Sequence, residues 1–298
     1  MKRTIGIIEL FITATIWGTA FVAQSMGNEI VGPFTFNGAR YVVGAIVLIP
    51  LILVLKNMDN SEANYKMEDP QIIKNTIIGG AFCALALTAG SSLQQVGLLY
   101  TTVGKAGFGT SLYIILVPFV GVLLHKKIRG RIWIAAVIAI IGFYLLCMSE
   151  TTTINKGDLM VLIGAVAWSI HIHIVDYFAP KVNPVMMSSV QFVVSAIICF
   201  TIAAFTENVV WADIVRCAFP ILYAGVMSCG IAYTLQMVGQ ANVEPALACL
   251  IMSLESVVSA IAGWIILGQK MIAVEIFGSI LVFIGVIIAQ LPDKEEVQ

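Results

Sequence analysis

Charge is scarce in this chain of 298 residues, of which only 11% are Asp, Glu, Lys or Arg. A soluble domain of ordinary composition carries about 25% charged residues. Hydrophobic residues make up 59% of the chain, and the mean hydropathy is +0.98. This composition argues against a soluble protein and predicts one that lies in a lipid bilayer. The net charge of −1 provides no excess of basic side chains, so we expect no nucleic-acid partner.

Motifs for catalysis and cofactor binding are also missing. Six cysteines are present, but no two have the spacing of a redox motif or a zinc site. The glycine-rich run 104–109 lacks the Gly-Lys-Ser/Thr of a phosphate-binding loop. His171 and His173 are two residues apart, which places them on opposite faces of a helix, so only one can face the interior. We therefore expect no metal, no cofactor, no catalytic residue and no enzymatic activity.

Ten apolar stretches fill the chain instead, with lengths that suit transmembrane helices. None alternates between apolar and polar residues as a strand would. Several begin with proline, and Asp69 and Asn183 precede two of these prolines as candidate N-caps. The sequence thus predicts an all-α integral membrane protein with ten transmembrane helices. The predicted spans are residues 5–24, 33–55, 70–95, 101–124, 132–148, 158–178, 184–205, 213–240, 245–267 and 272–290.

The second half of the chain repeats features of the first. Trp17 and Trp168 are 151 residues apart, and the prolines that open the second and seventh spans have the same separation. The run Leu-Gln-Gln-Val-Gly at 93–97 recurs as Leu-Gln-Met-Val-Gly at 235–239. These matches indicate an internal duplication.

Each unit holds five spans, an odd number, so the second unit must cross the bilayer in the opposite direction. The predicted domains are two inverted five-helix repeats, residues 1–149 and 150–298, which is typical of secondary transporters. Lysine and arginine favour the cytoplasmic side of membrane proteins. With the N-terminus in the cytoplasm, eleven of the sixteen basic residues lie on that side, and only Lys156, Arg216 and Lys270 on the other. Both termini should then be cytoplasmic.

A wider set of residues carries a family likeness over essentially the whole chain. The set is Trp17-Gly18, Pro33 to Arg40, 97–106, 111–118, Trp168, Ser253-Leu254-Glu255 and Leu267-Gly268. Together these residues resemble the EamA-type branch of the drug/metabolite transporter superfamily. The resemblance implies ten helices in two inverted repeats, a central cavity, and movement of small metabolites, often amino acids or drugs, usually by export. The chain departs from the family pattern at Ser256, where Pro is common, and at Gln269, where Glu is common.

Polar residues inside the predicted spans are the candidates for function, because a bilayer makes them costly. At about 1.5 Å per residue, Trp17 and Trp168 fall near the bilayer midplane, and Glu255 falls at a similar depth. Glu255 is a candidate coupling or structural carboxylate. It could respond to protons or substrate, or it could hydrogen-bond its helix to the neighbouring helices. The family resemblance favours the structural role.

Arg40 and Lys105 are the two basic residues within spans, and both are candidates for substrate binding. Arg40, about 10 Å below the outer end of its span, could attract a carboxylate of the substrate or form a structural ion pair. Its counterpart in the second repeat, Gln191, is a neutral candidate, so the repeat symmetry is broken in charge. Lys105 begins the fourth span, where we expect its long side chain to reach back to water. If both cations face the cavity, it would favour anions or zwitterions.

Gln94 and Gln236 occupy matched positions, and with Trp17 and Trp168 they form a symmetric set of candidate substrate-binding groups. Amides donate and accept hydrogen bonds, and indole faces hold flat or cationic groups. This lining suits amphipathic organic molecules better than bare ions. The alternative is structural, with interhelical hydrogen bonds for the glutamines and core packing for the tryptophans.

A second polar group is predicted near the cytoplasmic side. His173 precedes Asp176 by three residues near the end of its span, and Glu9 begins the first span at the same level. These three residues are a weak candidate for a cytoplasmic gate. An ordinary polar cluster at the membrane interface is the competing interpretation.

Together, these features predict a secondary carrier that exports small organic metabolites, with amino acids as one class, from a bacterial cytoplasm across the inner membrane. No ATP-binding motif is present, so uphill transport would use an ion gradient or exchange. The expected partners are a small-molecule substrate and the lipid bilayer, and a monomer and a homodimer both stay open. Three other classes compete: an integral-membrane enzyme, a channel, and a non-transporting membrane scaffold.

Overall fold

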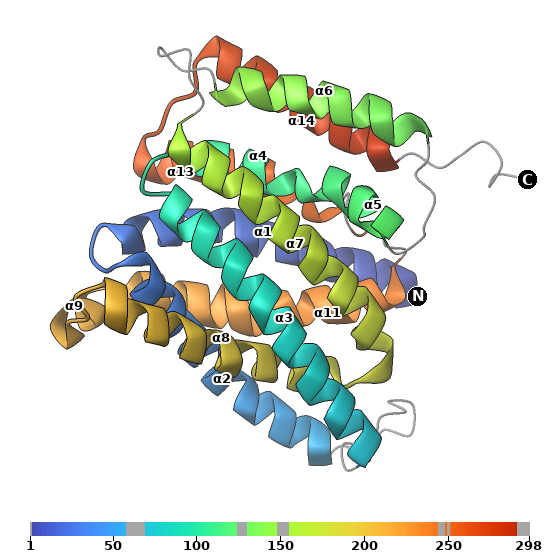
Figure 1. The fold of residues 1–298 in the computed structure, drawn as a ribbon, viewed down its shortest axis with the longest axis vertical. Coiled ribbons are helices and arrows are strands. Elements are labelled where there is room, and N and C mark those ends of the chain that lie inside the picture. The colour runs from blue at the N-terminus through green and yellow to red at the C-terminus, as the bar shows by residue number, and fades with distance from the viewer. Residues whose placement is uncertain are drawn as a thin grey trace, which may run out of the picture.

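The computed structural model describes residues 2–57, 69–123, 130–147, 155–243, 248 and 251–290, and every regular element in these ranges is helical (Figure 1). The first five helices are α1 (Lys2–Asn28), α2 (Pro33–Asn57), α3 (Pro70–Gly97), α4 (Val103–Ser111) and α5 (Tyr113–Leu123). Then follow α6 (Gly130–Cys147), α7 (Lys156–Phe178), the short 3₁₀ turn η1 (Ala179–Lys181) and α8 (Pro184–Thr206). The chain continues with α9 (Trp211–Arg216), α10 (Ala218–Leu222), the π-helix η2 (Tyr223–Ala232), α11 (Tyr233–Asn242), α13 (Leu254–Leu267) and α14 (Ala273–Gln290).

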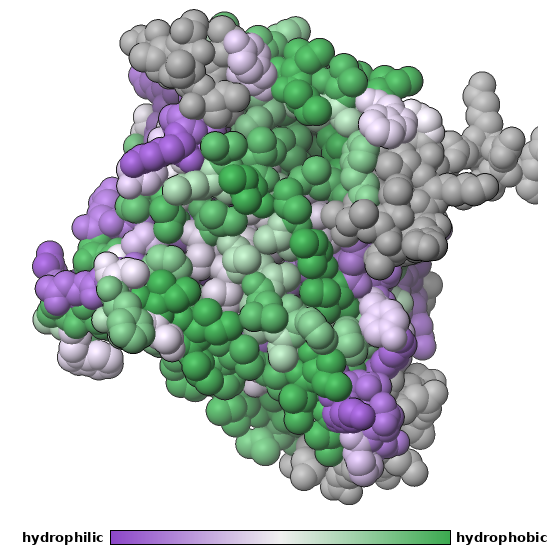
Figure 2. All heavy atoms as spheres, in the orientation of Figure 1, coloured by the Kyte–Doolittle hydropathy of each residue, from purple (hydrophilic) through white to green (hydrophobic). Residues whose placement is uncertain are grey.

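Six helical segments are long and apolar enough to cross a membrane, and four further apolar helices are shorter. Their outward faces carry many large hydrophobic side chains, such as Phe82, Ile140 and Ile265, each more than half exposed. Figure 2 shows hydrophobic residues across the middle of the visible face, with hydrophilic ones gathered towards its left and right edges. Such a belt is what lipid contact requires, and it confirms the predicted all-α integral membrane protein.

The predicted helix starts at Asp69 and Asn183 are confirmed. The Asp69 side chain accepts a hydrogen bond from the backbone N–H of Gln71, and Asn183 accepts from Val185 and Met186. Each cap satisfies N–H groups that the first turn of a helix leaves without an intrahelical partner. The predicted start of the ninth span, at Pro245, lies outside the described residues.

Two predicted spans are broken in the structure. The fourth is divided at Leu112 into α4 and α5, where the hydroxyl of Ser111 donates back to the carbonyl of Phe108 at 2.8 Å. The eighth is interrupted at Cys217, and from Ala218 to Asn242 it is one helical segment in which α10 passes into the π-helix η2 and then into α11. A π-helix is rare and is frequently found at functional sites. Apolar periodicity alone could not show these divisions, because the residues on both sides of them are apolar.

Many of the helices that pack against each other are distant in sequence. α3 packs along α7 and α8, α2 along α8, and α1 along α13 and α11. α6 and α14 form a pair at the edge of the molecule (Figure 1). Their close approach depends on glycine, because a Cβ atom on Gly142 would come within 2.6 Å of the Val282 nitrogen.

Both ends of the helical body lie on one side of the molecule. In Figure 1, α1 begins and α14 ends on the right. α1 then runs to the left, whereas α7 begins on the left and ends on the right. The two helices that carry Trp17 and Trp168 thus cross the molecule in opposite directions.

Candidate functional site

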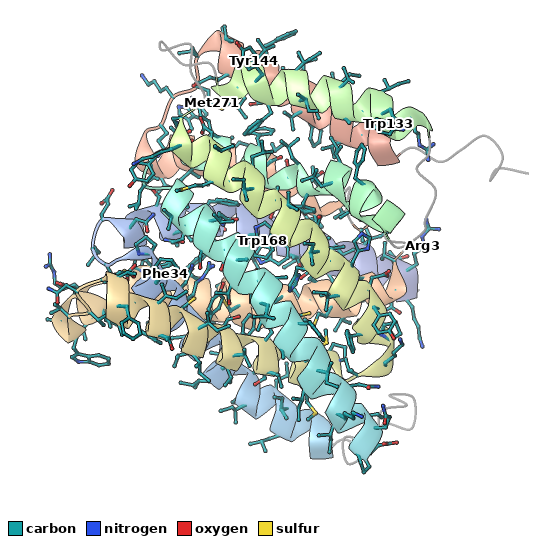
Figure 3. All side chains as sticks on the ribbon, in the orientation of Figure 1. Arg3, Phe34, Trp133, Tyr144, Trp168 and Met271 are labelled. Atoms are coloured by element: carbon teal, nitrogen blue, oxygen red, sulfur yellow. The ribbon has the colours of Figure 1, made fainter. Side chains whose placement is uncertain are left out.

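A cavity lies at the centre of the helical body, among α1, α2, α3, α4, α5, α7, η2, α11 and α13. It is narrow, with a volume of about 50 Å³. Trp168, one of its lining residues, lies near the middle of the molecule in Figure 3. Sites for small molecules typically hold about 300–1,000 Å³, so the helices must move apart to admit a metabolite.

Most of the residues predicted for the site lie in this lining. The cavity brings together two tryptophans, two glutamines and two charged residues: Trp17, Trp168, Gln94, Gln236, Arg40 and Glu255. They come from α1, α7, α3, α11, α2 and α13 respectively. Polar side chains that were isolated along the sequence therefore share one central space.

Tyr233 joins the aromatic residues of the lining into one cluster. Its ring centroid lies 4.9 Å from that of Trp17 and 6.5 Å from that of Trp168. Phe192 and His171 stand nearly perpendicular to the same ring, at 5.5 Å and 6.1 Å. Aromatic pairs favour these tilted and edge-to-face arrangements. Tyr233 is at the first residue of α11, directly after the π-helix, so the backbone of η2 positions the centre of the cluster.

Arg40 is a buried cation without a carboxylate beside it. Its side chain is 4% exposed, and no carboxylate oxygen of a described residue lies within 4.0 Å of the guanidinium. Nη2 donates to the Tyr41 hydroxyl at 3.3 Å, and that hydroxyl donates to Ser91 at 2.5 Å. The guanidinium carbon lies 5.0 Å from the centre of the Tyr41 ring, an attractive cation–π contact. These neutral contacts orient Arg40 but leave its charge uncompensated.

Glu255 stands on another wall of the same cavity and is 3% exposed. Its carboxylate hydrogen-bonds with Tyr113 of α5, and Oε1 has no partner among the described residues. Gly18, next to Trp17, lets α1 approach α13 here, because a Cβ atom on it would lie 2.7 Å from the Glu255 carbonyl oxygen. Glu255 thus links α13 to α5 and borders the cavity with one oxygen that has no partner in the described part of the chain.

Several other polar atoms of the lining have no hydrogen-bond partner in the described part of the chain. The donors are the indole N–H groups of Trp17 and Trp168 and Nε of Arg40, and the acceptors include Gln236 Oε1. Buried polar groups are normally paired, and unpaired ones are costly. A ligand that offers both an anionic acceptor and a cationic donor would satisfy atoms of both kinds.

The prediction that Lys105 reaches back to water is wrong. Its Nζ lies 2.8 Å from Oε1 of Glu275 at the start of α14, and both side chains are about nine-tenths buried. Lys105 also does not line the cavity. The carboxylate of Glu275, which is distant in sequence, takes the place of water beside the ammonium group of Lys105. The resulting ion pair joins α4 to α14.

Gln191 is fully buried but does not line the cavity. Its Oε1 lies 3.0 Å from Nε2 of His171, which does line it. Of the two histidines on α7, His171 is the one that faces the interior, whereas Nε2 of His173 donates to the Val117 carbonyl at 2.8 Å. Gln191 therefore supports a lining residue instead of forming the wall itself.

The three gate candidates do not line one hollow together. Asp176 is exposed and lines a hollow between the ends of α7 and α11, but Glu9 and His173 do not line it. Glu9 is partly buried on α1, and one of its carboxylate oxygens has no partner in the described structure.

Nine of the fifteen lining residues were not predicted as site residues, and Tyr233, His171 and Gln24 are among them. Gln24 accepts a hydrogen bond from Gln94 at 2.9 Å, so α1 contributes an amide of its own. The signal for Gln24 was present in the sequence, since an amide near the end of an apolar span is unusual. Tyr233 gives no such signal, because a tyrosine can face lipid, the membrane interface or the core equally well.

Metal-binding geometry is not found in the described ranges, where no three His, Cys, Asp or Glu side chains come together. Cys83, Cys199, Cys217 and Cys229 are buried and form no disulfide with one another. The lining offers aromatic, amide, hydroxyl, aliphatic and charged groups, which suits an organic ligand.

Known proteins resemble this chain over its whole length. The model of the EamA-like transporter family matches residues 4–148 and 155–290. An uncharacterized transporter of Archaeoglobus fulgidus is 28% identical over 98% of this chain and 87% of its own length. The uncharacterized transporter YwfM of Bacillus subtilis is 25% identical, covering 99% of this chain and 97% of the relative. A solved crystal structure superposes with a TM-score of 0.68 at 17% identity, over 95% of this chain and 96% of that one, which supports the fold alone.

Proposed function

The chain belongs to the EamA-like transporter family and is a multi-pass membrane transporter, and from this premise we propose that it exports small organic metabolites across a bacterial inner membrane. Amino acids are the leading substrate class. The observation that carries this proposal is the central cavity, where unpaired opposite charges and aromatic rings line one space. In this proposal the chain is a carrier and none of these residues is catalytic.

The charge arrangement supports a zwitterionic substrate. Arg40 on α2 can bind a carboxylate through its planar fork of donors. Glu255 on α13 can accept a hydrogen bond from an ammonium group, and the indole faces of Trp17 and Trp168 favour cationic or flat groups. Arg40 and Glu255 do not form an ion pair with each other, although both line the same cavity. Each charge therefore stays available to a ligand.

The proposed architecture is ten transmembrane helices in two inverted repeats, residues 1–149 and 150–298. Its support is threefold: the sequence duplication, the two stretches matched by the family model, and the opposite directions of α1 and α7 in Figure 1. An inverted pair places Trp17 and Trp168 at equivalent depths, where both can contact one substrate. Both chain ends would be cytoplasmic, which agrees with the start of α1 and the end of α14 on one side of the molecule.

The mechanism that follows is alternating access. Two groups of helices rock around the central cavity, which opens to one side of the membrane and then to the other. Uphill transport would be driven by an ion gradient or by exchange. Glu255 is the candidate group for proton coupling, because a carboxylate at this depth can bind and release a proton as its surroundings change.

A thermal-shift screen on the detergent-solubilised protein tests substrate binding first. A ligand that binds the folded state raises the melting temperature by mass action. We expect zwitterionic metabolites to raise it and matched neutral compounds to leave it unchanged. Positive compounds are then tested for exchange in vesicles of the purified protein. A protein that exchanges no member of a broad amino-acid and metabolite panel would not be the carrier proposed here, and a membrane scaffold would replace it.

A further inference from the structure

Four amide side chains join α1 to α3 at one end of the cavity. Gln94 Nε2 donates to Oε1 of Gln24, and Gln95 Nε2 donates to the backbone carbonyl of Gln24, both at 2.9 Å. Gln95 Nε2 also donates to Oδ1 of Asn28, and Asn28 Nδ2 returns a bond to the Gln95 carbonyl, again at 2.9 Å. We call these residues, Gln24, Asn28, Gln94 and Gln95, the amide clamp.

The amide clamp stands between the cavity and one side of the molecule. Gln24 and Gln94 line the cavity, and Asn28 is one helical turn beyond Gln24, at the last residue of α1. α3 ends two residues after Gln95, so both helices finish at the clamp. In Figure 1 these ends lie on the left, opposite the start of α1. In the proposed orientation this is the outer face.

Outside the clamp, α1 and α3 have little contact with each other. α1 packs along α13 and α11, whereas α3 packs along α7 and α8. The main apolar contact beside the clamp is a cluster in which Leu98, just after α3, meets Phe21 and Val22 of α1. The hydrogen bonds of the clamp therefore connect two groups of helices that are otherwise held to different neighbours.

Neutral amides suit a contact that must open and close. Their hydrogen bonds can be exchanged for bonds to water at small net cost, whereas a separated ion pair or a bare apolar seam would be costly to expose. Gln94 also accepts a hydrogen bond from Thr110 of α4 at 3.3 Å, and both residues line the cavity. A ligand in the cavity can compete for Gln94 and so weaken its bond to Gln24.

We propose that the amide clamp is the outer gate, whose opening separates α1 from α3 and connects the cavity with the outer face. This inference rests on the proposed function for its biological meaning, but the geometry can be tested without any substrate. The proposal gives a gating role in the transport cycle, beyond any contact with the substrate, to Gln24, Asn28, Gln94 and Gln95.

The test measures access to the cavity from each side. The six native cysteines are replaced, and Ser228 of the cavity lining is changed to cysteine, Ser228→Cys. A membrane-impermeant maleimide is then applied to the outer or the inner side of oriented vesicles. Gln95→Met removes the two interhelical hydrogen bonds that the Gln95 side chain donates, at nearly constant side-chain volume. From the strength of such hydrogen bonds in membranes, labelling from the outer side should rise about tenfold.

Gln71→Met is the matched control, since Gln71 is exposed at the other end of α3 and its side-chain amide donates to Asn75 of the same helix. Its labelling should equal that of the unchanged protein on both sides. Unchanged outer labelling in Gln95→Met, or an equal rise on both sides, would refute the gate. If Gln95→Met does not fold, Asn28→Ala is tested in its place. If neither variant folds, the clamp is needed for folding and the gate is refuted. If labelling changes as expected but the protein exchanges no metabolite, the proposed transport function is refuted, whereas the assignment of the clamp as a gate is upheld.

Discussion

Arg40 and Lys105, the two buried cations among the described residues, lie in different surroundings. At the junction of α4 and α14, Lys105 is neutralised by Glu275 at 2.8 Å, and Glu275 also accepts a hydrogen bond from the backbone of Ile272. In the central cavity, Arg40 is equally buried but contacts only neutral partners among the described residues. A charge that holds helices together is paired within the protein. A charge left unpaired beside a cavity is available to a ligand.

Lys105→Met should produce the largest loss of stability of the substitutions considered. It leaves the Glu275 carboxylate buried without its partner, which typically costs about 3–5 kcal/mol of unfolding free energy. The measurement is a chemical or thermal unfolding curve in detergent. The double variant Lys105→Met with Glu275→Gln should recover most of the loss, because no buried charge then remains unpaired. A single variant as stable as the unchanged protein would mean that the ion pair does not hold α4 to α14.

Arg40→Met should show the opposite pattern. Removal of an uncompensated charge leaves no carboxylate without a partner, so the melting temperature should change little. Hydrogen bonds to charged groups contribute about 1.5–3 kcal/mol, so exchange per folded molecule should fall about 10- to 100-fold. Arg40→Lys, which keeps the charge but not the fork of donors, should lie between the two. If Arg40→Met unfolds the protein as Lys105→Met does, the contrast between the two cations is lost.

Glu255→Gln separates coupling from structure. The amide keeps a hydrogen-bonding group towards Tyr113 but cannot carry a proton. If Glu255 is the coupling group, accumulation driven by a pH gradient should disappear while exchange without a gradient continues. Vesicles with and without an imposed pH gradient give both rates. If Glu255→Gln abolishes both the gradient-driven accumulation and the exchange, and the yield of folded protein falls as well, the role of the carboxylate is structural.

Trp168→Ala should have the smallest effect on transport of the four. The indole offers a flat face to the ligand, and such contacts contribute about 0.5–2 kcal/mol, so exchange should weaken severalfold. Folded yield should stay near normal, because the side chain is only partly buried and borders open space. A parallel loss of yield and exchange would show that Trp168 only packs. Trp17→Ala, in the matched position of the first repeat, gives the comparison.

Much of this account could be predicted from the sequence, for identifiable reasons. Long apolar runs predict membrane helices because lipid leaves the backbone few alternatives. Polar residues inside those runs predict the lining because they are costly elsewhere, which is why Arg40, Gln94 and Glu255 lie where they were expected.

The remainder depends on how each helix is rotated about its own axis and on partners distant in sequence. Lys105 was expected to reach water because Glu275 is far along the chain, and Gln191 was expected in the wall although it supports His171 from behind. Tyr233 has no distinguishing sequence context, and the π-helix that positions it is invisible to apolar periodicity.

One transport measurement tests the central claim most directly. Purified protein in vesicles is assayed for exchange with a matched series: an amino acid, its amide without the carboxylate, and its deaminated acid without the ammonium group. The account predicts fast, saturable exchange of the amino acid and much slower exchange of both analogues, because Arg40 and Glu255 each lose a partner. Equal exchange of all three compounds, or exchange of none across a broad panel, would contradict it.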